Sequence, residues 1–180
     1  MLDYHDREWG RPLRGQTAMF ERMTLEAFQS GLSWLVILRK RANFRLAFAG
    51  FDLETVAGYT ERDVARLMAD AGIVRNRAKI EAAIANARVV VHSGVDLSDL
   101  LWSYAPSPRP RPVTGADVPS QTPESAALAG VLKRRGFRFV GPTTAYALMQ
   151  ATGMVDDHLR DCPVPGSGTP PVAIRDNGKH

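Results

Sequence analysis

The chain has 180 residues, 44% of them hydrophobic, which is enough for one globular domain with a buried core. No apolar run reaches the roughly 20 residues that a membrane span needs, no signal-peptide pattern opens the chain, and one cysteine excludes an internal disulfide, so we expect a cytoplasmic protein. The net charge of +4 is concentrated in basic clusters at 39–41, 75–79 and 133–138, which suit nucleic acid but are also typical of solvated helix faces.

The first part of the chain has the pattern of successive short helices. Apolar side chains between residues 17 and 29 fall on one face of a 3.6-residue period, and Gly31 ends the run. Ser33 can cap a second helix that begins at Trp34, and Asp52 can cap a third.

A more specific pattern covers residues 61–91. Thr60, with Asp63 three residues later, predicts a capping box at the start of one helix. A second helix follows after the tight connection at 71–76, so the segment is expected to form a helix, a hairpin and a helix.

This hairpin can be interpreted as a phosphate clamp. Gly72 permits a tight turn, and the amides that open the second helix are expected to point outward as free donors. Arg75, Arg77 and Lys79 add positive charge. Such a unit holds a nucleic-acid backbone without reading bases, although a plain helical hairpin with an arginine-rich surface has the same pattern.

The second part of the chain is also predicted to be helical. Five prolines between 104 and 121 exclude a persistent helix or central strand, so this stretch is expected to be a connector. Thr122 then caps a helix, and another runs from Gly141 to Gly153. Residues 163–180 are expected to be a disordered tail. Because no region shows sustained alternation, the fold class is all-α, with two helical lobes separated at the connector.

A half-buried acid near aromatic residues is the first candidate for chemistry. Glu26 sits at the margin of the apolar face of its helix, where a carboxylate could accept hydrogen bonds from a base or act as an acid, although most such glutamates pair with an arginine. Trp34, Tyr4 and Trp9 offer flat apolar faces. Aromatic residues are more often core, but together with one acid they could hold an extruded base.

Three metal-capable residues lie at opposite ends of the chain: His5, His158 and Cys162. On a helix, the His-x3-Cys spacing would place the last two on one face. Tetrahedral zinc would need a fourth ligand, and His92 and His180 are poorly placed to supply it. Ordinary hydrogen-bonded histidines and a small semi-buried cysteine are the alternative.

Several long tracts of the chain form one recognisable set. They are YHDREWGRP (4–12), LEAFQSGLSWLVILRKR (25–41), FRLAFAGFD (44–52), DAGIVRNRAKIEAAIANAR (70–88) and LKRRGFRFVGPTTAYALMQATGMVDDH (132–158), followed by Cys162. Together they resemble the type I 3-methyladenine DNA glycosylases of the helix-hairpin-helix superfamily. The similarity extends in order from residue 4 to residue 162 and implies a helix-hairpin-helix glycosylase domain over 1–162.

The resemblance implies a role for each of three pocket residues. Glu26 would accept hydrogen bonds from the alkylated base, Trp34 would stack on it, and Tyr4 would complete the pocket. The implied activity is monofunctional hydrolysis of the N-glycosidic bond of 3-methyladenine, because no lysine stands where a Schiff base would form. The implied partner is double-stranded DNA containing alkylated bases, bound by a monomer without a membrane. No water-activating residue can be named from the sequence.

The resemblance also implies a structural zinc held by His5, His158 and Cys162. The family's fourth ligand, a cysteine ahead of the Y-H-D motif, would lie before Met1 and is absent here, as is a tryptophan near it. A start site placed too far downstream is the favoured explanation. Asp156 stands where the family usually has asparagine, which adds negative charge beside the zinc pair.

Two other functions fit part of these patterns. One is a non-catalytic helix-hairpin-helix module that binds DNA and has lost its N-terminal pocket and zinc residues. The other is a metal-dependent hydrolase that uses His5, His158 and Cys162 with an open fourth position.

Overall fold

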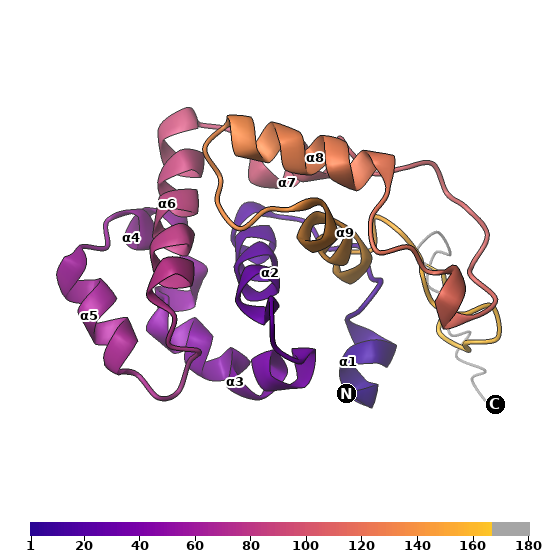
Figure 1. The fold of residues 1–180 in the computed structure, drawn as a ribbon, viewed down its shortest axis with the longest axis horizontal. Helices are drawn as coiled ribbons and strands as arrows, with labels where there is room; N and C mark the ends of the chain where they lie inside the picture. The colour runs from indigo at the N-terminus through magenta and orange to yellow at the C-terminus, as the bar shows by residue number, and fades with distance from the viewer. Residues whose placement is uncertain (167–180) are drawn as a thin grey trace, which may run out of the picture.

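The computed structural model describes residues 1–166, and within that range it is entirely helical, with no strand (Figure 1). The all-α prediction is therefore confirmed. No helix in this range has the length and apolar character needed to cross a bilayer. The elements are α1 (Leu2–Arg7), α2 (Gln16–Gln29), α3 (Trp34–Ala47), the 3-10 helix η1 (Ala49–Phe51), α4 (Leu53–Ala57), α5 (Glu61–Ala69), α6 (Arg77–Ser93), α7 (Leu97–Trp102), the 3-10 helix η2 (Gly115–Asp117), α8 (Pro123–Arg134) and α9 (Pro142–Ala151).

The predicted helix starts after Asp52, Thr60 and Thr122 agree with the structure because they depend on local capping, whereas α3 begins at Trp34 as predicted but Ser33 makes no side-chain capping hydrogen bond. The side chain of Asp52 accepts a hydrogen bond from the Thr55 amide, and Thr60 and Asp63 form the expected capping box. Helices α1 and α7 were not predicted. Each has only six residues, too few for an apolar period to be recognised.

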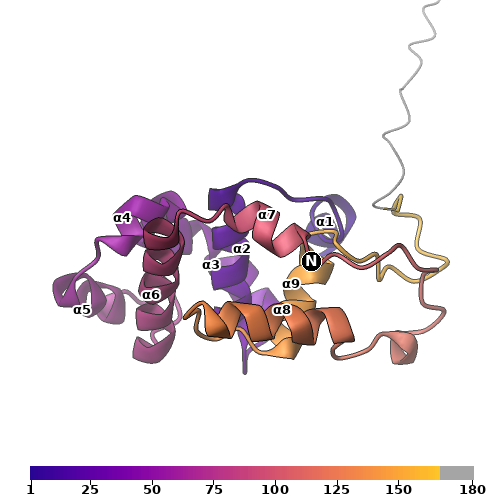
Figure 2. The same ribbon diagram turned by 90° about the horizontal axis from the view of Figure 1, so that it is seen from above.

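Helix α2 lies at the centre of the molecule, with α4, α5 and α6 to one side and α1, α8 and α9 to the other (Figures 1 and 2). It packs against α3, α6, α7 and α9 and is therefore buried around most of its circumference. Phe28 of α2 forms a buried aromatic cluster with Phe44 and Phe48. Each such side chain stabilises the core by about 2–3 kcal/mol.

The proline-rich stretch at 104–121 links α7 to α8 without an α-helix or strand, as predicted, but it is firmly attached. Arg111 within it donates to Asp156 and to the carbonyls of Cys162 and Val164. Val164 is buried, so the predicted tail begins too early at 163. The rest of that prediction, residues 167–180, lies outside the described residues.

Two glycines allow the N-terminal segment to lie directly against the end of α9. Gly10 and Gly153 both have positive φ (+72° and +73°). A Cβ on Gly10 would lie 2.6 Å from Cε1 of His158, and one on Gly153 would lie 2.5 Å from the carbonyl carbon of Arg11. The Gly10 amide also donates to the Gln150 carbonyl at 3.1 Å. This close approach brings α1 beside α9 and so forms one wall of a cavity.

Candidate active site

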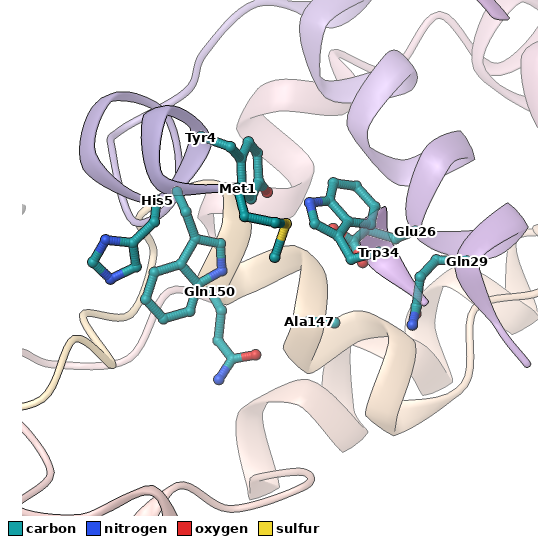
Figure 3. A pocket seen from close by; sticks show the side chains of 9 residues that line it. Met1, Tyr4, His5, Glu26, Gln29, Trp34, Ala147 and Gln150 are labelled. Atoms are coloured by element: carbon teal, nitrogen blue, oxygen red, sulfur yellow. The ribbon is translucent and has the colours of Figure 1, made fainter. Parts of the chain in front are cut away.

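A cavity of about 330 Å³ opens between α1, α2, α9 and the start of α3 (Figure 3). It brings together the three residues predicted to bind a base, although they are far apart in the sequence. Its size falls within the range of small-molecule sites in proteins. The cavity is lined by Met1, Tyr4, His5, Trp9, Glu26, Gln29, Trp34, Ala147 and Gln150.

Glu26 provides the acid of this cavity. It is only 6% exposed, so it is fully buried rather than half-buried as the helical pattern predicted. Packing on several sides of α2 explains the difference, because a single amphipathic stripe underestimates burial in a central helix. Burial raises the pKa of the Glu26 carboxyl to about 7, and the positive charge of Arg22 opposes this rise. The acid therefore titrates near neutral pH.

Aromatic rings form two walls of the cavity. The ring centroids of Tyr4 and Trp34 are 5.5 Å apart with an interplanar angle of 47°, and burial raises the pKa of the Tyr4 hydroxyl to about 12. Trp9 also lines the cavity and stacks on His5, with a centroid distance of 6.0 Å. Such faces can hold a flat heterocycle by stacking.

Arg22, on α2, was missed by the sequence reasoning. Its side chain is 9% exposed, and its Nη1 donates to the Tyr4 hydroxyl at 2.5 Å. Its Nη2 lies 3.6 Å from Oε2 of Glu8. The Glu8 carboxylate also accepts two hydrogen bonds from Arg41, at 2.5 Å on Oε2 and at 2.8 Å on Oε1. The signal that could have found Arg22 was its position four residues before Glu26, on the same face of the helix.

Gln150 is a second lining residue that the sequence did not reveal. Its Nε2 donates to Oδ2 of Asp157 at 2.8 Å, which fixes the amide at the cavity wall. Asp157 is 4% exposed and also accepts hydrogen bonds from the Tyr146 hydroxyl at 2.5 Å and from Arg109 at 2.6 Å. The i, i+4 spacing of Tyr146 and Gln150 on α9 was the available clue.

The three predicted metal ligands converge beside the cavity. One ligand atom from each of His5, His158 and Cys162 lies within 4.8 Å of the other two, and Sγ of Cys162 is 3.9 Å from Nε2 of His5. Nε2 of His158 is buried and has no hydrogen-bond partner among residues 1–166. Nδ1 of His158 faces Asp156 at 2.9 Å, and Nδ1 of His5 faces Asp6 at 2.7 Å. These carboxylates leave both Nε2 atoms available as ligands.

The His158–Cys162 pair is not on a helix, so the helical spacing considered for it does not apply. Helix α9 ends at Ala151, in agreement with the predicted end of the last helix, and His158 and Cys162 lie in irregular turns after it. The segment is attached to Arg111 of the connector through the Cys162 carbonyl and the Asp156 carboxylate. A long-range contact therefore holds the two residues near each other.

The hairpin between α5 and α6 rests on α3. A Cβ on Gly72 would lie 2.8 Å from Oδ1 of Asp70 and 3.1 Å from Nδ2 of Asn43, so glycine lets these two side chains approach the turn closely. Lys40 donates to the Ala71 carbonyl at 2.8 Å. Arg75 is exposed at the tip.

The two other predicted phosphate-binding side chains have partners within the protein. Arg77 pairs with Glu61 at 2.7 Å and Glu81 at 3.2 Å. Nζ of Lys79 donates to the carbonyls of Phe28 at 2.9 Å and Ser30 at 2.6 Å, and the residue is 8% exposed. Lys79 therefore points inward and supports the end of α2.

The amides that open α6 were expected to be free donors, but one of them is not. The side chain of Asn76 accepts a hydrogen bond from the backbone amide of Lys79 at 3.1 Å. This N-cap satisfies one of the donors that the phosphate-clamp interpretation had counted as available.

A family model and two curated relatives all identify the same family for this chain. The model of a family described as methyladenine glycosylase matches residues 1–165. The DNA-3-methyladenine glycosylase of Haemophilus influenzae is 42% identical over 170 residues, covering 90% of each chain. DNA-3-methyladenine glycosylase 1 of Escherichia coli is 44% identical over 167 residues, covering 89% of each.

Solved structures agree with the sequence matches. A crystal structure of 3-methyladenine DNA glycosylase I is 43% identical, with a TM-score of 0.86 over 89% of this chain and 91% of that one. A 3-methyladenine DNA glycosylase I in complex with 3-methyladenine, which carries a tyrosine-to-phenylalanine substitution, is 36% identical, with a TM-score of 0.83 over 91% of each chain.

Proposed function

This chain belongs to the methyladenine glycosylase family, and from that premise we propose that it excises 3-methyladenine from alkylated DNA in base-excision repair. It is an N-glycosyl hydrolase. The observation that carries this function is the buried carboxyl of Glu26 in a cavity walled by the rings of Tyr4 and Trp34.

The cavity suits a base that has been taken out of the DNA stack. Methylation at N3 makes adenine cationic within DNA, so a buried carboxylate and two aromatic faces favour it over a neutral base. The carboxylate of Glu26 would accept hydrogen bonds from the base, while Trp34 and Tyr4 would lie against its faces. Discrimination by these groups sets which base enters.

The protein needs to lower the activation barrier only modestly, because the methylated base leaves as a neutral molecule. The oxygen of a water molecule forms a bond to C1′ of the sugar, the bond from C1′ to N9 breaks, and its electron pair returns to the base. The proton of the water passes to solvent. No step needs a lysine, and we propose a monofunctional enzyme that leaves the strand uncut.

The proposed partner is duplex DNA bound by a monomer in the cytoplasm, without a membrane. The hairpin between α5 and α6 would hold the backbone, with Arg75 exposed at its tip and the close turn at Gly72 giving its shape. Arg77 and Lys79 would contribute less directly, because both have partners within the protein.

A structural zinc is the further part of this proposal. Two imidazoles and a thiolate are suitable zinc donors, and the buried Nε2 of His158, which has no partner within residues 1–166, supports the fit of His5, His158 and Cys162. They would supply three of four tetrahedral ligands and fasten α1 to the turns after α9. This gives the proposed architecture of two helical lobes with a clasped terminus.

The zinc proposal is tested on the protein alone. Purified protein should contain about one equivalent of zinc, and a chelator should lower its melting temperature by several degrees. Cys162→Ser should lose the metal and the chelator effect together. Metal-free protein whose melting temperature does not respond to a chelator would contradict the zinc clasp.

The function is tested by incubating the protein with methylated duplex DNA and identifying the released base. We expect free 3-methyladenine and an abasic site without strand cleavage. Binding of this DNA without release would favour the non-catalytic module. Turnover abolished by a chelator while the fold survives would favour the metal-dependent hydrolase.

A further inference from the structure

We propose that Arg22 is a positioning residue of this glycosylase: from behind the cavity, its guanidinium holds the Tyr4 hydroxyl in place and sets a positive charge one helical turn from Glu26, the acid that would face a cationic base. The proposal deepens the proposed function and rests on it. It assigns a task to a buried cation that the mechanism above does not use.

The geometry places Arg22 behind the walls of the cavity rather than in its lining. Its guanidinium carbon is 5.3 Å from the ring centroid of Tyr4 and 5.9 Å from that of Trp34. Its Nη1 donates to the Tyr4 hydroxyl at 2.5 Å. One planar group therefore lies over both rings that would hold a base and is hydrogen-bonded to one of them.

Arg22 also lies four residues before Glu26 on α2, which puts the two side chains on one face of the helix. Among the influences on the Glu26 carboxyl, burial raises its pKa and the charge of Arg22 lowers it. Because both residues are buried, solvent screens this attraction weakly. Arg22 thus opposes the protonation that burial favours.

The desolvation penalty for burying the Arg22 guanidinium is offset by the nearby carboxylate of Glu8. Glu8 lies 3.6 Å from its Nη2, and Arg41 holds Glu8 through two hydrogen bonds. Acid and base alternate along the series Glu26, Arg22, Glu8 and Arg41. With Glu26 ionised the series is neutral, so a cationic base entering the cavity would add one positive charge that Glu26 faces directly.

The pH dependence of Glu26 also depends on what the elements packed against α2 present to the cavity. Helix α9 presents Ala147 and Gln150 to the cavity, and η1 packs on α2 through Phe51. Helix α7 meets the beginning of α2 through Ser98. Besides Arg22, the charged or titratable groups that interact with Tyr4, Glu8 or Arg41, or that line the cavity, are His5 of α1, Glu21 and Glu26 of α2, and Arg41 and Arg45 of α3, and Lys79 of α6 donates to the end of α2.

The experiment compares Arg22→Met with wild type in binding of free 3-methyladenine across pH 5.5 to 9, followed by tryptophan fluorescence. Methionine keeps the volume and apolar stem but removes the charge. Comparison at equal pH cancels the ionisation of the ligand itself. Loss of Arg22 should raise the pH at which the Glu26 carboxylate forms, so the acid limb of binding should move upward by about one pH unit.

The sign of this effect separates positioning from a merely structural role. Near pH 6.5 the variant should bind about ten-fold more weakly, and above pH 8.5 most of the loss should disappear, because Glu26 is then ionised in both proteins. Arg22→Lys should restore the limb to its wild-type pH. It should leave a small pH-independent loss, since an ammonium lacks the fork that reaches Tyr4 and Glu8 together.

Arg66→Met is the matched control. Arg66 also packs over a tyrosine, 5.2 Å from the ring centroid of Tyr59, but lies away from the cavity. It should leave the binding profile unchanged. Equal loss for Arg22→Met at every pH, with no movement of the acid limb, would overturn the proposal. So would an Arg22→Lys profile that matches Arg22→Met.

A direct titration keeps this test independent of the proposed function. The Glu26 carboxyl can be followed by carbon-detected NMR in the intact chain without any ligand, and its midpoint should rise in Arg22→Met. If wild type releases no 3-methyladenine but the Glu26 midpoint is higher in Arg22→Met than in wild type, the proposed function is wrong and the role of Arg22 stands. If wild type releases the base but the two midpoints are equal, the function stands and the role of Arg22 is wrong.

Discussion

The hairpin and the cavity are built in opposite ways. The hairpin comes from one continuous stretch, 61–91, and its charged Arg77 is exposed and paired with neighbours on α5 and α6. The cavity takes residues from Tyr4 to Gln150, on four helices, and buries an acid and an arginine among aromatic rings. The helix starts of the hairpin follow local rules of capping, and of its predicted phosphate-binding charges Lys79 alone is buried, whereas the cavity places its acid inside. Such departures from the usual surface placement of charges are expected at sites of function.

The largest expected effect comes from removing the charge of the buried acid. Glu26→Gln keeps the shape of the side chain but presents an amide that can donate as well as accept. Excision of 3-methyladenine should fall by about a hundred-fold or more, because a preorganised charge facing the base is lost. Single-turnover release from methylated DNA measures it.

The comparison with the hairpin supplies the control. Affinity of Glu26→Gln for unmodified duplex DNA should stay close to wild type, because the proposed backbone contacts lie on the other region. Parallel loss of excision and of backbone affinity would show that Glu26 supports the fold instead, and that the two regions are not separable.

The next largest effect should come from Asp157, which holds Gln150 at the cavity wall. Asp157→Asn replaces an acceptor of three hydrogen bonds with a group that must donate toward Tyr146, Gln150 or Arg109. The free energy of unfolding should fall by about 2 kcal/mol, measured in urea.

Its matched variant in the hairpin is Asp63→Asn, at an exposed capping box. That change should cost about 0.5 kcal/mol, because water replaces part of what is lost. Similar losses from the two variants would remove the distinction between a buried, long-range network and a local cap.

Glu26 should also show the stability cost of the cavity. Its folded pKa of about 7 lies above its ordinary value, so the folded protein binds one more proton than the unfolded chain between about pH 4.5 and 7. Stability should therefore fall as pH rises through this window. Glu26→Gln should be more stable than wild type by up to about 3 kcal/mol at pH 8, with most of the gain gone by pH 5.

Glu21→Gln on the same helix serves as the reference, since Glu21 pairs with Arg45 near the surface and should yield no gain. If the stability gain of Glu26→Gln over wild type is no larger at pH 8 than at pH 5, burial does not disfavour the carboxylate.

The same contrast explains what the sequence could reveal. The caps at Asp52 and Thr60 were predictable because the groups that bond are three residues apart. The grouping of Glu26, Trp34 and Tyr4 came from resemblance to a family, not from periodicity. Lys79 was misplaced at the surface because its partners, the carbonyls at the end of α2, lie about fifty residues away.

Long-range partners were beyond local reasoning in the cavity as well. Arg22 carries a local clue in its spacing from Glu26, but its contact with Glu8 depends on how α1 packs beside α2. The network around Asp157 likewise needs Arg109 from the proline-rich connector. In each case a charge that looks solvated in sequence is buried by an element that arrives from far along the chain.

The smallest expected effect belongs to the hairpin and tests whether its surface charges act separately. Arg75 is exposed at the tip, whereas Arg77 is held by Glu61 and Glu81. Arg75→Ala should weaken binding to unmodified duplex a few-fold and reduce the salt slope by about one, because one phosphate contact is lost. Arg77→Ala should change the slope less, since its charge is already neutralised. Fluorescence anisotropy across 50 to 200 mM salt measures both, and equal slope changes would show that Arg77 leaves its acids for a phosphate. Neither variant should alter binding of free 3-methyladenine, because the cavity is assembled from other helices.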